Sequence, residues 1–166
     1  MFLLRLLASC LCAASFFLST AAPAEETGDA RDTPPKFGTA NPEMLAAIGR
    51  ARASLDDFLE LVRHPEPDTS TFKLKILVRD GNAMETFWVK PFWILDEGFE
   101  GTIANTPEVV RNVSLGETVT FSRDDIVDWG YVRNKRQVGS FTVCVLFKYM
   151  RPADVEYFRR YNGFDC

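Results

Sequence analysis

Residues 72–90 read FKLKILVRDGNAMETFWVK, and this stretch decides the fold. Apolar and charged residues alternate over 72–78 with only Leu77 out of step, which predicts a half-buried β-strand. Residues 80–82, Asp-Gly-Asn, are a turn signal, and an apolar-rich run follows at 84–90. The stretch therefore predicts an antiparallel hairpin.

Trp88 in the second strand of this hairpin is the best candidate for a functional aromatic residue. Phe87 and Val89 are expected to face inward and Trp88 outward, because the opposite arrangement would carry Lys90 into the core. An exposed aromatic side chain makes a good binding platform, since it buries a large area with few rotatable bonds. Pro91 is expected to end the pairing of this strand or to place it at a sheet edge.

Helices and further short strands flank the hairpin. Asn41-Pro42 predicts a helix start, and an apolar stripe continues to residue 63, with a break into two pieces predicted at Ser54. After the hairpin the sequence predicts strands at 99–104, 118–121, 126–133 and 138–149 and a helix at 152–161. The connections are too short for crossover helices. The predicted fold class is α+β, with an N-terminal helix, a mainly antiparallel sheet of about five or six short strands and a short C-terminal helix.

The first 24 residues have the pattern of a secretory signal peptide. A basic start ending at Arg5 precedes an uncharged run at 6–22, and a small-residue cleavage site ends at Ala24. We therefore expect a signal peptide at 1–24, a flexible leader at 25–40 and a single domain at 41–166, with a periplasmic or secreted location and no transmembrane segment in the mature chain. The alternative is a lipoprotein cleavage box that leaves Cys10 lipidated.

Composition excludes several classes of function. The formal net charge of −4 argues against a nucleic-acid partner, which would select a basic surface. His64, the single histidine, is expected to be an exposed loop residue, and its isolation rules out a multi-histidine metal site. The sequence contains no phosphate loop, dinucleotide glycine motif or Gly-x-Ser-x-Gly motif. We therefore expect no metal and no cofactor.

Cys144 and Cys166 remain after removal of the signal peptide. In an oxidising compartment they either form a disulfide or serve separately, Cys144 as a small core residue and Cys166 as a free thiol. The sequence leaves both possibilities open.

Three hypotheses about function remain. The preferred one is a non-enzymatic binding module for an unknown protein, peptide or cell-envelope ligand. The alternative is a carboxylate-dependent hydrolase with Glu85 and Asp128 as the pair, since such enzymes use two carboxyl groups about 5 to 9.5 Å apart. In the third, Asp128 caps a turn and the tryptophans fill the core, which we expect for at least two of the three tryptophans.

A series of short motifs adds a family resemblance. In chain order they are residues 85–89 (ETFWV), 98–101 (GFEG), 104–107 (ANTP), 115–121 (LGETVTF), 125–129 (DIVDW) and 139–143 (GSFTV). This order resembles the YegJ-like family of uncharacterised bacterial domains over about residues 70–149. The resemblance implies a small α+β domain, often exported or membrane-associated, with no established activity, and it supplies no catalytic residues to carry over to this chain. The family's recurring positions match Glu85, Trp88, Gly101, Asn105, Pro107, Gly116, Asp128 and Trp129.

From these positions we expect a ligand-binding surface. It comprises Trp88, Asn105, Pro107, Asp128 and Trp129. The chain departs from the family pattern after Trp88, where residues 90–93 (KPFW) add an aromatic-rich segment. That departure puts the pairing of the second hairpin strand in doubt.

Overall fold

A computed structural model describes residues 41–166. The predicted signal peptide at 1–24, the leader at 25–40 and Cys10 lie outside the described residues. In chain order the elements are α1 (Pro42–Ala53), α2 (Leu55–Arg63), β1 (Thr69–Asp80), β2 (Ala83–Ile94), β3 (Phe99–Ile103), β4 (Thr118–Phe121), the 3-10 turn η2 (Arg123–Asp125), β5 (Ile126–Arg133), β6 (Arg136–Gly139), α3 (Phe141–Phe147) and α4 (Pro152–Asn162). The predicted α+β class is confirmed.

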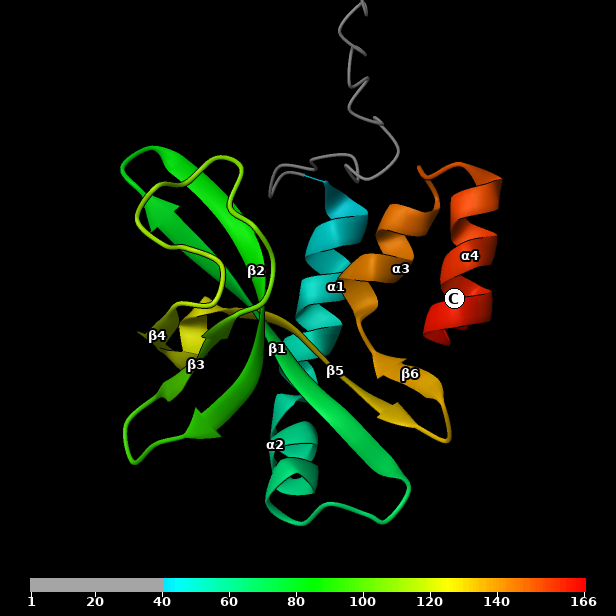
Figure 1. Ribbon diagram of the computed structural model, residues 1–166, viewed down its shortest axis with the longest axis horizontal. Coiled ribbons are helices and arrows are strands. Elements are labelled where there is room, and N and C mark those ends of the chain that lie inside the picture. The colour runs from blue at the N-terminus through cyan, green and yellow to red at the C-terminus, as the bar shows by residue number, and fades with distance from the viewer. Residues whose placement is uncertain (1–40) are drawn as a thin grey trace, which may run out of the picture. The chain divides into compact units, whose positions relative to one another are not determined.

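The strands form one antiparallel sheet in the order β4-β3-β2-β1-β5-β6. β1 and β2 make the predicted hairpin, with Leu74 opposite Val89 and Asp80 opposite Ala83. β5 pairs along the other side of β1, so the hairpin occupies the centre of the sheet. Figure 1 shows α1 and α2 following one another along the sheet, with α3 and α4 beside its β5-β6 end.

The N-terminal helix begins and breaks as predicted. The Asn41 side chain accepts hydrogen bonds from the N–H groups of Glu43 and Met44 at 2.9 and 3.1 Å, which satisfies two donors at the first turn of α1. The break falls at Ser54, which separates α1 from α2. His64 ends α2 with its side chain largely exposed, 3.4 Å from a carboxylate oxygen of Glu60.

The main core lies between the sheet and the two N-terminal helices. Phe87 and Val89 are fully buried, which confirms their predicted inward direction. Phe58 of α2 stacks on Trp129 of β5 with ring centroids 4.8 Å apart. The indole N–H of Trp129 donates to the backbone oxygen of Ala51 at 2.9 Å. Burial of these large apolar side chains fixes α1 and α2 on this face of the sheet.

The strand predicted at 138–149 is wrong. β6 stops at Gly139, and residues 141–147 form α3 instead. The backbone turns at Gly139 and Ser140, whose φ angles of 75° and 54° do not continue a strand. The carboxylate of Asp128 then accepts hydrogen bonds from the N–H groups of Phe141 and Thr142, which starts the helix.

Pro91 lies where β2 loses one of its two partners. The pairing with β1 stops at Val89, opposite Leu74, as predicted, whereas β2 itself continues to Ile94 beside β3. Its pairing with β3 shifts register between Val89 and Phe92, so Pro91 lies in an irregularity of the ladder. Such a bulge accommodates proline, which has no N–H to give to a neighbouring strand.

The C-terminal helices enclose a small apolar cluster of their own, built on Phe147, Val155 and Phe164. A disulfide joins Cys144 of α3 to Cys166, so the structure selects the paired state of the two alternatives. No helix within residues 41–166 has the length and apolar character needed to cross a membrane.

Candidate functional site

A group of lysines surrounds Trp88 on the sheet face that points away from the main core. Leu74 and Ile76 of β1 are buried in that core, so the alternating residues Lys73 and Lys75 lie on the opposite face. Strand pairing sets Lys75 opposite both Trp88 of β2 and Asp128 of β5. We call this surface the lysine face; it consists of Lys73, Lys75, Trp88, Lys90 and Asp128, bordered by Gln137 and Thr142.

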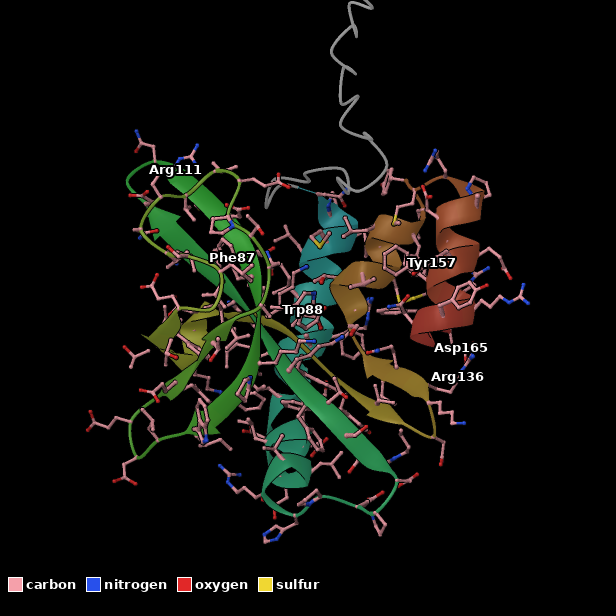
Figure 2. All side chains as sticks on the ribbon, in the orientation of Figure 1. Phe87, Trp88, Arg111, Arg136, Tyr157 and Asp165 are labelled. Atoms are coloured by element: carbon pink, nitrogen blue, oxygen red, sulfur yellow. A yellow bond between two sulfur atoms is a disulfide. The ribbon has the colours of Figure 1, made fainter. Side chains whose placement is uncertain are left out.

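Trp88 lies close to two ammonium groups. The Lys73 Nζ lies 4.6 Å from the centroid of the Trp88 ring, and the Lys75 Nζ lies 5.4 Å from it. Both distances fall within the range of cation–π attraction. Figure 2 shows Trp88 in the middle of the molecule, between the β1-β2 hairpin and the C-terminal helices. Trp88 is partly exposed, which leaves part of its surface open to a ligand.

Polar neighbours fix the positions of these lysines. Lys73 Nζ donates to Gln137 Oε1 at 3.1 Å, and Lys75 Nζ donates to Thr142 Oγ1 at 3.2 Å. Among residues 41–166, no carboxylate lies within 4.0 Å of the ammonium groups of Lys73, Lys75 or Lys90. The lysines are therefore oriented without a direct ion pair, although the charge of Asp128 attracts both Lys73 and Lys75.

Asp128 is the buried acid of the site, with none of its surface exposed. Its carboxylate accepts from the N–H of Trp129 at 2.9 Å, from the N–H groups of Phe141 and Thr142 at 3.2 and 2.8 Å, and from the Thr142 hydroxyl at 2.6 Å. All four partners are donors, so the ionised carboxylate fits this environment. Ser140, the N-cap residue of α3, makes no side-chain cap, and Asp128 serves in its place.

Burial and like charge change the proton affinities of the site. Burial is the largest cause that lowers the pKa of Lys73 to about 8, followed by the positive charge of Lys90. Burial also lowers the pKa of Lys75, against the attraction of Asp128. Burial raises the pKa of Asp128, while its hydrogen bonds to Thr142 and the charge of Lys75 oppose that rise. Clusters of shifted groups are typical of functional sites.

A glycine makes room for Lys73. A Cβ at Gly130 would lie 2.5 Å from the Ser140 Oγ and 2.9 Å from the Lys73 Cε, so no larger residue fits without displacing them. Ser140 is fully buried, and its hydroxyl has no hydrogen-bond partner among the described residues. A buried hydroxyl without a hydrogen-bond partner among the described residues therefore lies next to the Lys73 side chain.

Asn105 is a positioning residue for Trp88. Its side-chain oxygen accepts the backbone N–H of Trp88 at 2.8 Å, and the neighbouring Ala104 N–H donates to the Trp88 carbonyl at 2.8 Å. Together they continue the β2 ladder past the end of β3 at Ile103. The structure therefore brings Trp88 and Asn105 together, as predicted, through the backbone of Trp88.

Glu85 holds the loop between β3 and β4. Its carboxylate accepts N–H groups of three successive residues, Glu108, Val109 and Val110, at distances between 2.9 and 3.2 Å. The predicted binding residue Pro107 immediately precedes these donors and lines a shallow depression of the loop with Val110 and Leu115. Pro107 is thus part of the loop that Glu85 anchors, apart from the lysine face.

The structure does not bring Glu85 and Asp128 together. Glu85 shares the core side of β2 with Phe87, two residues away, whereas Asp128 shares the lysine face with Lys75. Each carboxylate already accepts several hydrogen bonds from the chain. The geometry gives no support to a hydrolytic pair of these residues.

The three tryptophans occupy three different environments. Trp129, predicted in the binding surface, is instead a core residue with 7% of its surface exposed. Its ring stacks on Phe58 of α2, and its indole N–H donates to the Ala51 carbonyl of α1. Trp93 is 50% exposed, and Trp88 is intermediate. The expectation of at least two core tryptophans is therefore wrong. Trp88 is the tryptophan that belongs to the lysine face.

The sequence patterns do not single out five residues of the site, which are Lys73, Lys75, Lys90, Gln137 and Thr142. The alternation over 72–78 already places Lys73 and Lys75 on the face shared with Trp88 once the hairpin register is known. The contributions of Gln137 and Thr142 come from elements more than 60 residues away, and no local pattern reveals them. The described residues contain no cluster of three metal-ligating side chains.

Comparison with known proteins places the chain in a family. The family model described as "Uncharacterized protein conserved in bacteria (DUF2314)" matches residues 41–166. The chain is 33% identical over 100 residues to "Uncharacterized protein YegJ" of Escherichia coli, an alignment covering 60% of this chain and 64% of that protein. It is also 34% identical over 64 residues to "Putative ankyrin repeat protein NMB1133/NMB1171" of Neisseria meningitidis, covering 39% of this chain and 25% of that one.

The matched regions span less than two thirds of either relative. No solved structure gives a significant match. Because the family match extends over the whole described domain, the chain belongs to DUF2314, a family of uncharacterised bacterial proteins.

Proposed function

We propose that this chain is an exported bacterial binding module that holds its ligand on the lysine face, against Trp88. The observation that carries the proposal is the placement of the Trp88 ring 4.6 and 5.4 Å from two ammonium groups that form no ion pair within 4.0 Å with a carboxylate of the described residues. A partly exposed aromatic ring beside cations combines apolar contact with charge recognition. The backbone bond from Asn105 holds this ring in place before a ligand arrives.

A binding role is favoured over catalysis by the state of the acidic residues. Asp128 has no uncommitted carboxylate oxygen for a substrate, because both of its oxygens accept hydrogen bonds from the start of α3. Glu85 is engaged with the loop on the other side of the sheet. Each acid therefore has a structural role in the domain. The groups that the lysine face offers to a ligand are its ammonium groups and the Trp88 ring.

Export is supported by two independent features. The basic start, uncharged run and small-residue site over 1–24 are the pattern of a signal peptide. The pairing of Cys144 with Cys166 suits an oxidising compartment such as the periplasm.

The experiment for the binding role is capture from native envelope extract on the immobilised domain. We expect Trp88→Ala to lose captured components that the parent domain retains. Trp93→Ala is the matched control, because Trp93 is an exposed tryptophan on the same strand. Equal capture by the parent and Trp88→Ala would overturn the site. Circular dichroism of each variant checks the fold.

The experiment for export is the intact mass of the protein recovered from the periplasmic fraction. We expect a chain that begins at Glu25, after cleavage behind Ala24. A lipidated chain that begins at Cys10 would replace the proposal by the lipoprotein alternative, and a full-length chain in the cytoplasmic fraction would contradict export.

A further inference from the structure

The charge on the lysine face is opposite to that of the protein. The whole chain has a formal net charge of −4, yet three lysines meet here around one buried acid. The pairing of β1 with β2 ends at Leu74 and Val89, and Lys73 and Lys90 are the next residues of the two strands, close enough for the charge of Lys90 to lower the pKa of Lys73. Like charges so near each other on a sheet are destabilising. The fold therefore maintains a costly concentration of positive charge at this place.

Asp128 attracts Lys73 and Lys75 but makes no ion pair with either of them. Its four hydrogen-bond donors come from the start of α3 and from its own strand, and none of them is a lysine. Lys73 and Lys75 donate only to neutral oxygens, those of Gln137 and Thr142. A negative charge from outside the described chain would satisfy the ammonium groups and relieve their mutual repulsion.

Two further hydrogen-bonding groups lie beside Lys73, the Gln137 amide and the Ser140 hydroxyl. The Gln137 amide presents its oxygen to Lys73, which leaves its NH2 group as a donor. The Ser140 hydroxyl, fully buried and without a partner among residues 41–166, lies over Gly130 next to the Lys73 side chain. The Ser140 hydroxyl is closed off from solvent, so the donors left for a ligand are the ammonium groups and the Gln137 amide, and such donors suit a group with several anionic oxygens.

We propose that the lysine face binds a phosphate group, with Lys73, Lys75 and Lys90 as its cationic ligands and Trp88 in contact with the portion of the ligand that carries the phosphate. Phosphate offers three strong acceptor oxygens and up to two negative charges, which matches three separate ammonium groups. Lysine binds phosphate as a point charge, whereas planar bidentate recognition of a carboxylate favours arginine. The inference names the ligand chemistry of the proposed binding module and rests on the same site.

The test is titration of the domain at pH 7 with inorganic phosphate at constant ionic strength, followed by the NMR signals of the Trp88 indole and the lysine side chains. We expect saturable shifts of these signals, with acetate and chloride giving none. Lys73→Gln and Lys90→Gln should each weaken phosphate binding about tenfold, the effect of losing one charge-assisted hydrogen bond. Lys135→Gln is the matched control, because Lys135 lies in the β5-β6 turn and outside the lysine face.

A second arm distinguishes the source of the phosphate. Vesicles of phosphatidylcholine with and without phosphatidylglycerol are mixed with the domain, in the presence and absence of inorganic phosphate. Binding to the anionic vesicles that inorganic phosphate displaces would assign a lipid headgroup. Saturable binding of inorganic phosphate without vesicle binding would assign a soluble phosphorylated ligand. Either result supports the phosphate site.

Two results would overturn the inference. Acetate that shifts the same signals with equal affinity would make the site a carboxylate site. Phosphate shifts that persist in Lys73→Gln and Lys90→Gln would place binding elsewhere. Neither result touches the Trp88 dependence of envelope capture, so the phosphate assignment and the proposed binding role fail separately.

Discussion

The side-chain oxygen of Asn105 accepts the backbone N–H of Trp88 at 2.8 Å, across 17 residues of chain. This bond ties the loop after β3 to the strand that carries the exposed aromatic ring. Because Trp88 stands at the centre of the lysine face, the loop that contains Asn105 also determines how the ring is presented.

Asn105→Ala should lower the free energy of unfolding by about 1–2 kcal/mol, because a part-buried backbone donor loses its partner. Asn105→Asp keeps an oxygen acceptor and should recover most of that loss. Urea denaturation measures both changes. Asn112→Ala removes an exposed hydrogen bond to the Arg79 carbonyl and is the control. It should lower the free energy of unfolding by less than Asn105→Ala does. Equal stability of Asn105→Ala and the parent would show that the bond does not hold the strand.

Asp128→Asn should destabilise the domain by about 2–4 kcal/mol, because the amide brings donors against the N–H groups that the carboxylate now accepts. We also expect faster amide exchange throughout α3, whose first turn Asp128 caps. Asp124→Asn on the exposed turn η2 is the matched control. Unchanged exchange in α3 would contradict the capping role.

The lowered pKa of Lys73 predicts a pH dependence with a definite sign. Burial and Lys90 lower this pKa from 10.5 to about 8, so between these pH values the folded chain holds fewer protons than the unfolded chain. The free energy of unfolding should therefore rise with pH across that interval, by up to about 2 kcal/mol once solvent screening of the ammonium is allowed for. Urea denaturation of the parent and Lys73→Met at each pH gives the difference that isolates Lys73. A difference that stays flat, or that falls with pH, would refute the shift.

Reduction of the disulfide between Cys144 and Cys166 should loosen the chain end. We expect Cys166→Ser to lower stability by about 3 kcal/mol, the chain-entropy contribution of a loop of this size. Amide exchange should increase at Gly163 and Phe164, where the remaining contacts are backbone bonds with Gln137 and Phe158, the Lys73 ammonium beside the Phe164 ring and the apolar cluster with Phe147. Amides of the central hairpin are the internal reference. Their equal acceleration would mean that the disulfide supports the whole domain.

The hairpin was predictable because its signals are local. The alternation over 72–78, the Asp-Gly-Asn turn and the inward direction of Phe87 are all contained in 19 consecutive residues. Asn41 and Ser54 likewise mark the helix start and break through bonds to residues no more than four positions away. Where the deciding interactions are short in sequence, pattern and structure agree.

The misjudged strand at 138–149 shows where local patterns fail. Its apolar alternation favours a strand, but the backbone turn at Ser140 and the capping by Asp128 start a helix. The cap bridges 13 and 14 residues and depends on the position of β5. Trp129 was misplaced for a similar reason, since only the packing of Phe58 from α2 shows that its ring lies in the core.

The candidate site was half predictable. Trp88 and Asn105 were identified as site residues, and the structure joins them. Lys73 and Lys75 occupy polar positions of β1, where the sequence pattern does not distinguish them from ordinary solvated side chains. Their significance depends on the strand register, on Gly130 and on Gln137, which meet only in the folded domain.

The central claim is that the ligand contacts Trp88, and site-directed photo-crosslinking in living cells tests it most directly. A photoreactive phenylalanine analogue replaces Trp88 in one strain and Trp93 in another, and crosslinked products are identified by mass spectrometry. The account predicts a specific adduct from position 88 that Lys73→Gln weakens, with none from position 93. Identical adducts from both positions, or none from position 88 while the folded protein is present in the envelope, would contradict it.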